Sequence, residues 1–181
     1  MFLNIITPCS RPENLLKISE SINIQEKNYR WIVVVDSYEL PKYNLIPKNC
    51  EIYTHKDPES ISGNAQRNYA LDLIKDGYVY FNDDDTILHP HLWDNIKDLN
   101  NDFISFRQLN KDLTLRLFGD LISVGFIDSH NFIVSRELID KTKFTLNKYE
   151  ADGIFATECF KNSKSALWLN KPLSIYNSLR D

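Results

Sequence analysis

The stretch that decides the fold runs from residue 78 to residue 86 and reads Tyr78-Val79-Tyr80-Phe81-Asn82-Asp83-Asp84-Asp85-Thr86. Its first residues have the β-branched and aromatic side chains of a buried strand, and three adjacent carboxylates follow shortly after. Like charges this close repel one another, so their position at the end of a buried strand favours a positive partner. Carboxylate oxygens suit Mg²⁺ or Mn²⁺, which also keep positions for water and substrate phosphate. A plain acidic turn after a strand is the alternative.

The rest of the chain alternates between strand and helix patterns, which predicts an α/β fold. The first helix is predicted to begin at Ser10-Arg11-Pro12-Glu13, with Pro12 in its first turn. Continuous apolar strands are buried on both faces, so the central sheet should be mainly parallel and flanked by helices. No repeat or composition shift divides the chain, and residues 1–181 are predicted to form a single domain. Strands are predicted at 2–7, 31–35, 51–54, 78–81, 103–107, 131–134, around Trp168 and at 171–176, and later helices at 62–75, 91–99 and 152–161.

The overall composition restricts the classes of function. Hydrophobic residues make up 43% of the 181 residues and charged residues 25%, as in ordinary globular proteins. A formal net charge of -4 gives no broad positive field, so we expect no nucleic-acid partner. Three scattered cysteines, Cys9, Cys50 and Cys159, indicate a reducing compartment rather than a disulfide framework. No apolar stretch has membrane-spanning length and no leader is recognisable, so we expect a soluble, unprocessed, cytoplasmic protein without a membrane span.

Polar residues follow three of the predicted strands at their carboxyl ends. Thr7 and Arg11 follow the first strand, Asp36 ends the second, and the acidic triplet ends a later one. Ligands of open parallel sheets bind beyond these ends, so the three groups are predicted to share one crevice. Gly63-Asn64-Ala65-Gln66-Arg67-Asn68 adds a helix entry with an arginine one turn later, although a solvated Arg67 is an equal alternative. No GxGxxG or GxxxxGK[ST] motif supports a dinucleotide site or a Walker-type site.

These motifs, in this order, resemble the family 2-type glycosyltransferases of the GT-A fold. The resemblance rests on Ile5-Ile6-Thr7-Pro8 with Arg11, Asp36, residues 63–68, and Asp83-Asp84-Asp85, which is similar to that family's DxD motif. It covers the first half of the chain well and the second half loosely. It implies a metal-dependent enzyme that moves one sugar from a nucleotide-sugar donor to an acceptor hydroxyl.

The resemblance also implies roles for these residues. Donor-site residues, which hold the base, ribose or diphosphate, would be Thr7, Arg11, Asp36 and Arg67, with Asp83 and Asp84 beside them. Asp83 would approach the ribose or a metal-bound water, and Asp85 would coordinate Mn²⁺ or Mg²⁺. UDP is the expected nucleotide because Asp36 and Arg67 suit a pyrimidine edge, with GDP and dTDP left open.

The second half contains Tyr149-Glu150-Ala151-Asp152-Gly153, which resembles the family's acidic catalytic motif. Inverting transfer requires a base for the acceptor hydroxyl, and Asp152 is the candidate, with Glu150 as its rival. Helix capping is the alternative role for Asp152. His130 is a candidate third metal ligand beside Asp85 and Asp83, and a hydrogen-bonded structural histidine is the alternative.

Two competing functions remain at this point. The chain lacks the Gln-x-x-Arg-Trp motif of processive synthases, which favours a single transfer to a glycan or lipid-linked glycan. A nucleotidylyltransferase-like enzyme would need a glycine-rich loop after the first strand, where Thr7-Pro8-Cys9-Ser10-Arg11-Pro12 has no glycine. A noncatalytic nucleotide-sugar-binding module would keep the donor crevice and lack the base.

Overall fold

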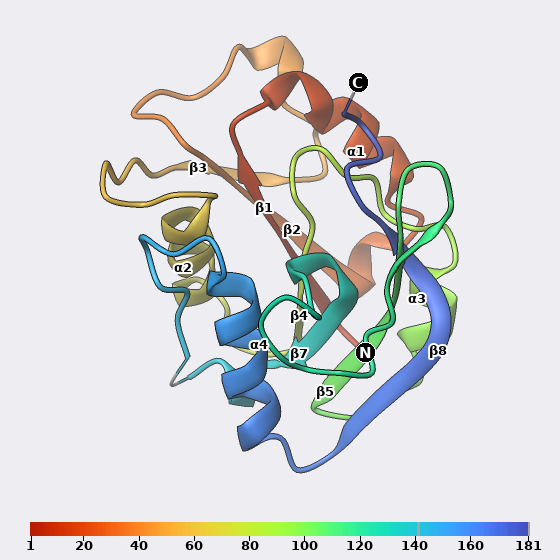
Figure 1. Ribbon diagram of the computed structural model, residues 1–181. Coiled ribbons are helices and arrows are strands. Elements are labelled where there is room, and N and C mark those ends of the chain that lie inside the picture. Colours follow the sequence, from red (N-terminus) through yellow and green to blue (C-terminus); the bar gives the residue numbers. More distant parts are fainter. Residues whose placement is uncertain (141, 181) are drawn as a thin grey trace.

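The computed structural model of the protein describes residues 1–140 and 142–180. Within these residues, eight strands form one sheet in the order β3-β2-β1-β4-β7-β5-β6, and β8 pairs with β5 outside that path (Figure 1). The strands are β1 (Leu3–Cys9), β2 (Tyr29–Val35), β3 (Glu51–Thr54), β4 (Tyr78–Phe81), β5 (Phe103–Leu109), β6 (Leu115–Leu117), β7 (Phe132–Ser135) and β8 (Ala166–Ile175). The α-helices are α1 (Leu15–Ser21), α2 (Asn64–Asp72), α3 (Leu92–Ile96) and α4 (Ala151–Asn162). Short 3₁₀ helices are Pro12–Asn14, Glu26–Asn28, Tyr43–Leu45, Ser129–Asn131 and Arg136–Leu138.

Most strands of the sheet run in one direction. β1 lies between β2 and β4 and is parallel to both, with Leu3 opposite Tyr29 on one side and Tyr78 on the other. β3 is parallel to β2, and β8 is parallel to β5. β7 is antiparallel to both β4 and β5, so β5 again runs in the direction of β4. The predicted α/β fold with a mainly parallel sheet is therefore confirmed.

The helices cover both faces of the sheet. Ile6 of β1 packs in one hydrophobic cluster with residues of α2 and α4, while its neighbour Ile5 packs in a second cluster with residues of α1 and α3. Figure 1 shows α2 and α4 on one side and α1 and α3 on the other. Successive side chains of a strand point to opposite faces of the sheet. Because helices cover both faces, the side chains on both must be apolar, and this explains the uninterrupted apolar runs in the sequence.

A group of phenylalanines joins the end of β4 to α4. The ring of Phe81, the last residue of β4, packs edge-on against Phe144 and Phe155, with centroid distances of 5.1 and 5.5 Å. Phe144 and Phe155 stack on each other at 4.3 Å. All three side chains are buried. Their packing fixes the segment that follows β4 relative to the first turn of α4, which positions the site described below.

Some element boundaries differ from the sequence predictions. Pro12 begins a short 3₁₀ helix, and α1 begins only at Leu15, because the Ser10 hydroxyl donates a hydrogen bond to Asp84 instead of capping a helix. β6 was not predicted, since its residues lack the buried alternation of a core strand. The two strands predicted near the end of the chain form one strand, β8, whose register with β5 shifts near Arg107 and so accommodates Pro172.

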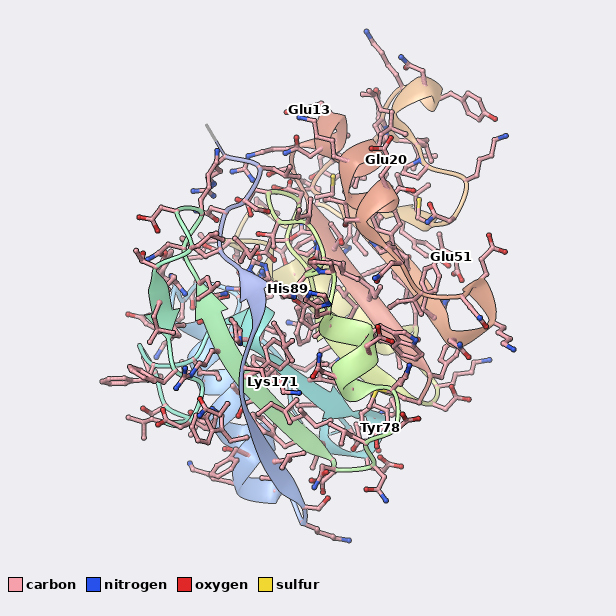
Figure 2. The ribbon with its side chains drawn as sticks, turned by 90° about the vertical axis from the view of Figure 1, so that its right-hand side faces the viewer. Glu13, Glu20, Glu51, Tyr78, His89 and Lys171 are labelled. Atoms are coloured by element: carbon pink, nitrogen blue, oxygen red, sulfur yellow. The ribbon has the colours of Figure 1, made fainter. Side chains whose placement is uncertain are left out.

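β8 lies next to α3. Figure 1 shows β8 along one edge of the molecule, and Figure 2 faces this edge, with Lys171 near its centre. Lys171 Nζ donates a hydrogen bond to Oδ1 of Asn95, in α3, at 2.6 Å. Within the described residues, every helix falls short of the length and apolarity that a membrane crossing requires.

Candidate active site

A cavity of about 430 Å³ lies beyond the carboxyl ends of β1, β2 and β4. The loops after these strands form one wall, and the first turns of α2 and α4 and the segment 116–129 form the others. Most of the site residues predicted from the sequence line it, namely Arg11, Asp36, Arg67, Asp83, Asp84, Asp85, Glu150 and Asp152. The structure thus brings polar residues from both halves of the chain around one space.

Asp84, which follows β4, forms hydrogen bonds with the loop after β1. Its Oδ2 accepts hydrogen bonds from the backbone nitrogen of Arg11 at 2.6 Å and from the Ser10 hydroxyl at 3.0 Å. Its Oδ1 accepts one from Arg11 Nη1, which makes a close ion pair, and only 4% of the Asp84 side chain is exposed. Asp84 is the residue of the acidic triplet whose carboxylate is the most fully engaged by the protein itself.

Asp85 points into the cavity and meets two guanidinium groups. Its Oδ2 lies 2.7 Å from Arg180 Nε and 3.3 Å from Arg11 Nη1. Its Oδ1 accepts a weaker hydrogen bond from the Thr86 hydroxyl at 3.3 Å. The two arginines come from segments far apart in the sequence, so their charges offset that of Asp85 only in the folded chain.

Asp83 shares its carboxylate between Arg67 and His130. Burial alone would raise the pKa of Asp83, but the charges of Arg67 and His130 outweigh burial and hold this pKa well below its usual range. Arg67 reaches Asp83 from the first turn of α2. That turn lies against β1 because Gly63, at a φ of +76°, has no Cβ; one placed there would come within 2.6 Å of Pro8 Cβ.

His130 is buried behind the cavity wall between two carboxylates. Its Nε2 lies 3.2 Å from Asp83 Oδ2, and its Nδ1 lies 3.4 Å from Asp128 Oδ1. Burial alone would lower the pKa of His130, but the two carboxylates raise it to about 9. The Asp83 backbone nitrogen also lies 2.9 Å from Nε2, which would suit a neutral ring, but two carboxylates outweigh one amide. His130 was expected to be a metal ligand, yet its ring nitrogens face these carboxylates rather than the cavity.

Asp36 lines the cavity, whereas Thr7 does not. Thr7 was expected to hold the donor, but its side chain is fully buried, and its Oγ1 accepts a hydrogen bond from Trp31 Nε1 at 2.9 Å. The alternation of β1 directs this side chain to the face of the sheet on which Ile5 and Trp31 pack with α1 and α3, away from the cavity. Asp36 lines the cavity, and its Oδ1 accepts a hydrogen bond from Gln66 Nε2 at 3.0 Å and forms an ion pair with Lys56 Nζ at 3.0 Å.

Asp152 and Glu150 lie one on each side of the start of α4. Asp152 is half-buried, and its Oδ1 accepts a hydrogen bond from the Gly153 nitrogen at 2.7 Å, within the first turn. Burial and the negative charge of Asp128 raise the pKa of Asp152 to about 6. Glu150 is exposed and stands at the N-cap position without a capping side-chain hydrogen bond. The raised pKa of Asp152 suits a proton acceptor at neutral pH.

Two cavity residues, Arg116 and Arg180, were missed by the sequence reasoning. Arg116 Nη1 lies 3.1 Å from Asp128 Oδ2, and its guanidinium stacks over the ring of Tyr176 at 3.8 Å. Neither arginine lies in a recognisable motif. Their partners are distant in sequence. The one available signal was the excess of carboxylates in the crevice, which requires positive side chains nearby.

The sequence was also compared with known proteins. No protein-family model matches it, and neither does any curated protein. Solved structures do match: Staphylococcus aureus TarS 1–349 has a TM-score of 0.76 at 16% sequence identity over 97% of this chain and 60% of that chain. TarS 1–349 in complex with UDP-GlcNAc has a TM-score of 0.73 at 15% identity, covering 97% and 58% of the two chains.

A third match is the mannosyltransferase PcManGT from Pyrobaculum calidifontis in complex with GDP-Man and Mn²⁺. Its TM-score is 0.67 at 12% identity, over 97% of this chain and 56% of that chain. The chain described here thus spans a little more than half the length of these proteins. The likeness shows that the chain has the fold that was expected from the GT-A resemblance.

Proposed function

We propose that this protein is a glycosyltransferase that takes one sugar from a nucleotide-sugar donor and transfers it to a hydroxyl of an acceptor. The observation that carries the proposal is a single cavity lined on one side by the acidic triplet, whose carboxylates pair with arginines, and on the other by Asp152, a half-buried carboxylate with a raised pKa. Such a transfer requires groups that bind the charged diphosphate of the donor and a group that removes the proton of the acceptor hydroxyl, and the cavity has both. The fold supports the proposal, since the similar structures include a mannosyltransferase and a protein bound to UDP-GlcNAc.

A divalent cation, Mn²⁺ or Mg²⁺, fits the acidic side of this cavity. The carboxylates of Asp83 and Asp85 both face it, and Asp85 Oδ1 has only one weak partner. Among the described residues, no group of three or more His, Cys, Asp or Glu side chains is arranged to hold a metal. Such ions are commonly held by one or two carboxylates, with substrate phosphates and water as further ligands. We therefore assign the cation to Asp85 with Asp83, where it would offset the charge of a leaving diphosphate.

The rest of the donor site is proposed on the same wall. Arg11 and Arg180 present guanidinium groups beside Asp85, and guanidinium groups pair well with phosphate oxygens. Asp36 and Gln66, at the end of β2 and in α2, offer hydrogen-bonding groups for the base and ribose. UDP remains our proposed nucleotide.

Asp152 is the proposed catalytic base. Its carboxylate would take the proton of the acceptor hydroxyl while that oxygen bonds to the anomeric carbon and the bond to the diphosphate breaks. Attack from the face opposite the diphosphate would invert the anomeric centre. A pKa of about 6 leaves Asp152 ionised at neutral pH and still able to accept a proton. Glu150 is the second candidate, since it lines the same cavity.

The acceptor and the location of the reaction are also proposals. Leu117, Val124 and Ile127 make the cavity wall partly apolar near the segment that packs on α4. A glycan or a lipid-linked glycan is therefore the proposed acceptor, with its reacting hydroxyl directed to Asp152. The three cysteines are free, and this supports a cytoplasmic location.

The first test is calorimetric titration of the purified protein with UDP, GDP and dTDP, each with Mn²⁺ and with chelator. We expect one nucleotide to bind only with metal, and Asp85→Asn to weaken that binding by about tenfold or more. Asp112→Asn is the matched control, because Asp112 is an exposed aspartate that does not line the cavity.

Two results would contradict the proposal in different ways. Failure of every nucleotide to bind would remove the donor site altogether. Metal-dependent nucleotide binding without transfer to any acceptor would instead favour a noncatalytic binding module.

A further inference from the structure

Arg180 pairs with Asp85, one of the two carboxylates proposed to hold the cation. Arg180 Nε lies 2.7 Å from Asp85 Oδ2, on the carboxylate that faces the cavity. The two side chains differ in exposure: 52% of the Arg180 side chain is exposed and 4% of the Asp85 side chain. The contact therefore joins a fixed, buried carboxylate to a cation that still reaches solvent.

The backbone around Arg180 is held in place by contacts that are separate from its ion pair with Asp85. The Leu179 nitrogen donates a hydrogen bond to the Asp85 carbonyl oxygen at 2.8 Å, and the Ile87 nitrogen donates one to Ser178 Oγ at 2.9 Å. The Leu179 side chain packs against the hydrophobic cluster under α1 and α3. These contacts keep the Arg180 backbone beside the cavity, so the guanidinium group can leave Asp85 by side-chain rotation alone.

Arg11, the other cation on Asp85, does not have this freedom. Its Nη1 lies 3.3 Å from Asp85 Oδ2 but makes a closer ion pair with Asp84 Oδ1. Its backbone nitrogen also donates to Asp84. Positive groups on one carboxylate repel each other, so a cation that binds Asp85 would displace an arginine. Arg180 would leave rather than Arg11, because Arg11 is also held by Asp84.

We propose that Arg180 is the resting counterion of Asp85, that it competes with the divalent cation for this carboxylate, and that it turns to the diphosphate when cation and nucleotide bind. This rests on the proposed function. It predicts effects of opposite sign for one side chain: Arg180 weakens binding of the metal alone and strengthens binding of nucleotide with metal. A group that only stabilised the fold would not produce this pair of effects.

The test is titration of Mn²⁺ in the absence of nucleotide, with free Mn²⁺ followed by electron paramagnetic resonance. Arg180→Ala should bind Mn²⁺ about fivefold more tightly than the wild type, the size expected for losing a competing half-exposed ion pair. Arg180→Lys keeps the charge and should remain close to the wild type. Arg30→Ala is the control, since it also removes an arginine that pairs with a carboxylate, Glu51, but does not line the cavity.

The second measurement is calorimetric titration of UDP at saturating Mn²⁺. Here Arg180→Ala should bind UDP about tenfold more weakly than the wild type, because it lacks a charged partner for the diphosphate. Arg180→Gln provides a second variant that keeps a polar side chain, and its thermal unfolding should match that of the wild type.

The outcomes separate the two proposals. Equal or weaker Mn²⁺ binding in both Arg180→Ala and Arg180→Gln would overturn the competition, whatever happens to nucleotide. Tighter Mn²⁺ binding supports it even if no nucleotide binds, although that second result would end the proposed transferase function. Tighter Mn²⁺ binding with unchanged UDP affinity would overturn the part in which Arg180 turns to the diphosphate.

Discussion

The carboxylates after β4 and the carboxylate at the start of α4 line the same cavity but have opposite electrostatic surroundings. Asp83, Asp84 and Asp85 each pair with at least one positive side chain. Asp152 instead accepts one backbone hydrogen bond and lies near the negative charge of Asp128. The same residue type is therefore a fixed negative charge on one side of the cavity and a proton acceptor on the other. The division suits binding on the first side and chemistry on the second.

The two sides also differ in what holds them in place. The acidic triplet is held by ion pairs and hydrogen bonds, such as those that Ser10 and Arg11 donate to Asp84. α4 is held by apolar packing, through Phe155 against Phe81 and Phe144. Polar contacts order the side on which charges must be placed. On the other side, burial and the charge of Asp128 outweigh the lowering effect of Arg67 on the pKa of Asp152.

The largest expected effect comes from removing the proton acceptor. Asp152→Asn should lower the rate of sugar transfer by about 100- to 10,000-fold, the usual contribution of a general base, with nucleotide affinity unchanged. In the wild type, transfer should fall as the pH drops through about 6, where Asp152 becomes protonated. A radiolabelled-sugar transfer assay across pH measures both effects.

Glu150→Gln is the control for this prediction, because Glu150 lines the same cavity but is exposed. Its transfer rate should stay within about tenfold of the wild type. The reverse result, with Glu150→Gln inactive and Asp152→Asn active, would exchange their roles and break the comparison drawn above.

The next largest effect concerns the stability of the binding side. Asp84→Ala should lower the free energy of unfolding by about 3 kcal/mol, because it leaves Ser10 and Arg11 without their buried acceptor. Asp112→Ala is the control: Asp112 also accepts two hydrogen bonds, from Thr114, but is exposed, so its loss should cost less than about 1 kcal/mol. Urea unfolding of both variants tests this. Equal losses would show that the Asp84 contacts do not hold the loop after β1.

A smaller effect should appear in the pH dependence of stability. The pKa of His130 is raised from 6.5 to about 9, so its ion pairs stabilise the fold fully below pH 6.5 and lose their effect as the pH rises through 9. The charged groups around His130 are Asp83, Asp128 and Arg67. We expect a loss on the order of 2 kcal/mol in the wild type over this range.

The corresponding variant is His130→Gln, which keeps a hydrogen-bonding side chain but cannot titrate. Its unfolding midpoint in urea should change less between pH 6.5 and 9.5 than that of the wild type. Parallel curves for the two proteins would mean that His130 is neutral and accepts the Asp83 amide instead.

Much of the first half of the fold was predictable from the chain. The runs 31–35 and 78–81 are apolar at every position because both faces of the sheet are covered, and this indicated parallel strands directly. The second half was less predictable. The pattern of 131–134 indicated a strand, but the direction of β7 depends on its partners β4 and β5, which no local pattern records.

The candidate site divides in a similar way. Asp36 and the acidic triplet were found because they follow strand ends, and parallel strands end at the same edge of a sheet. Thr7 also follows this rule, but the alternation of β1 turns it away from the cavity. Arg180 is separated from Asp85 by 95 positions and looks like any surface arginine in the sequence.

The sequence by itself determined where strands end and which polar residues stand there, because burial on both faces and the change from apolar to acidic residues are local properties. The tertiary structure alone decided which charges meet. Arg67, Arg180 and His130 reach the acidic triplet from three separate segments, while Asp152 is left with a backbone amide. The pKa of a carboxylate depends on the charges within a few ångströms and on its burial, and both are fixed only when distant parts of the chain pack together.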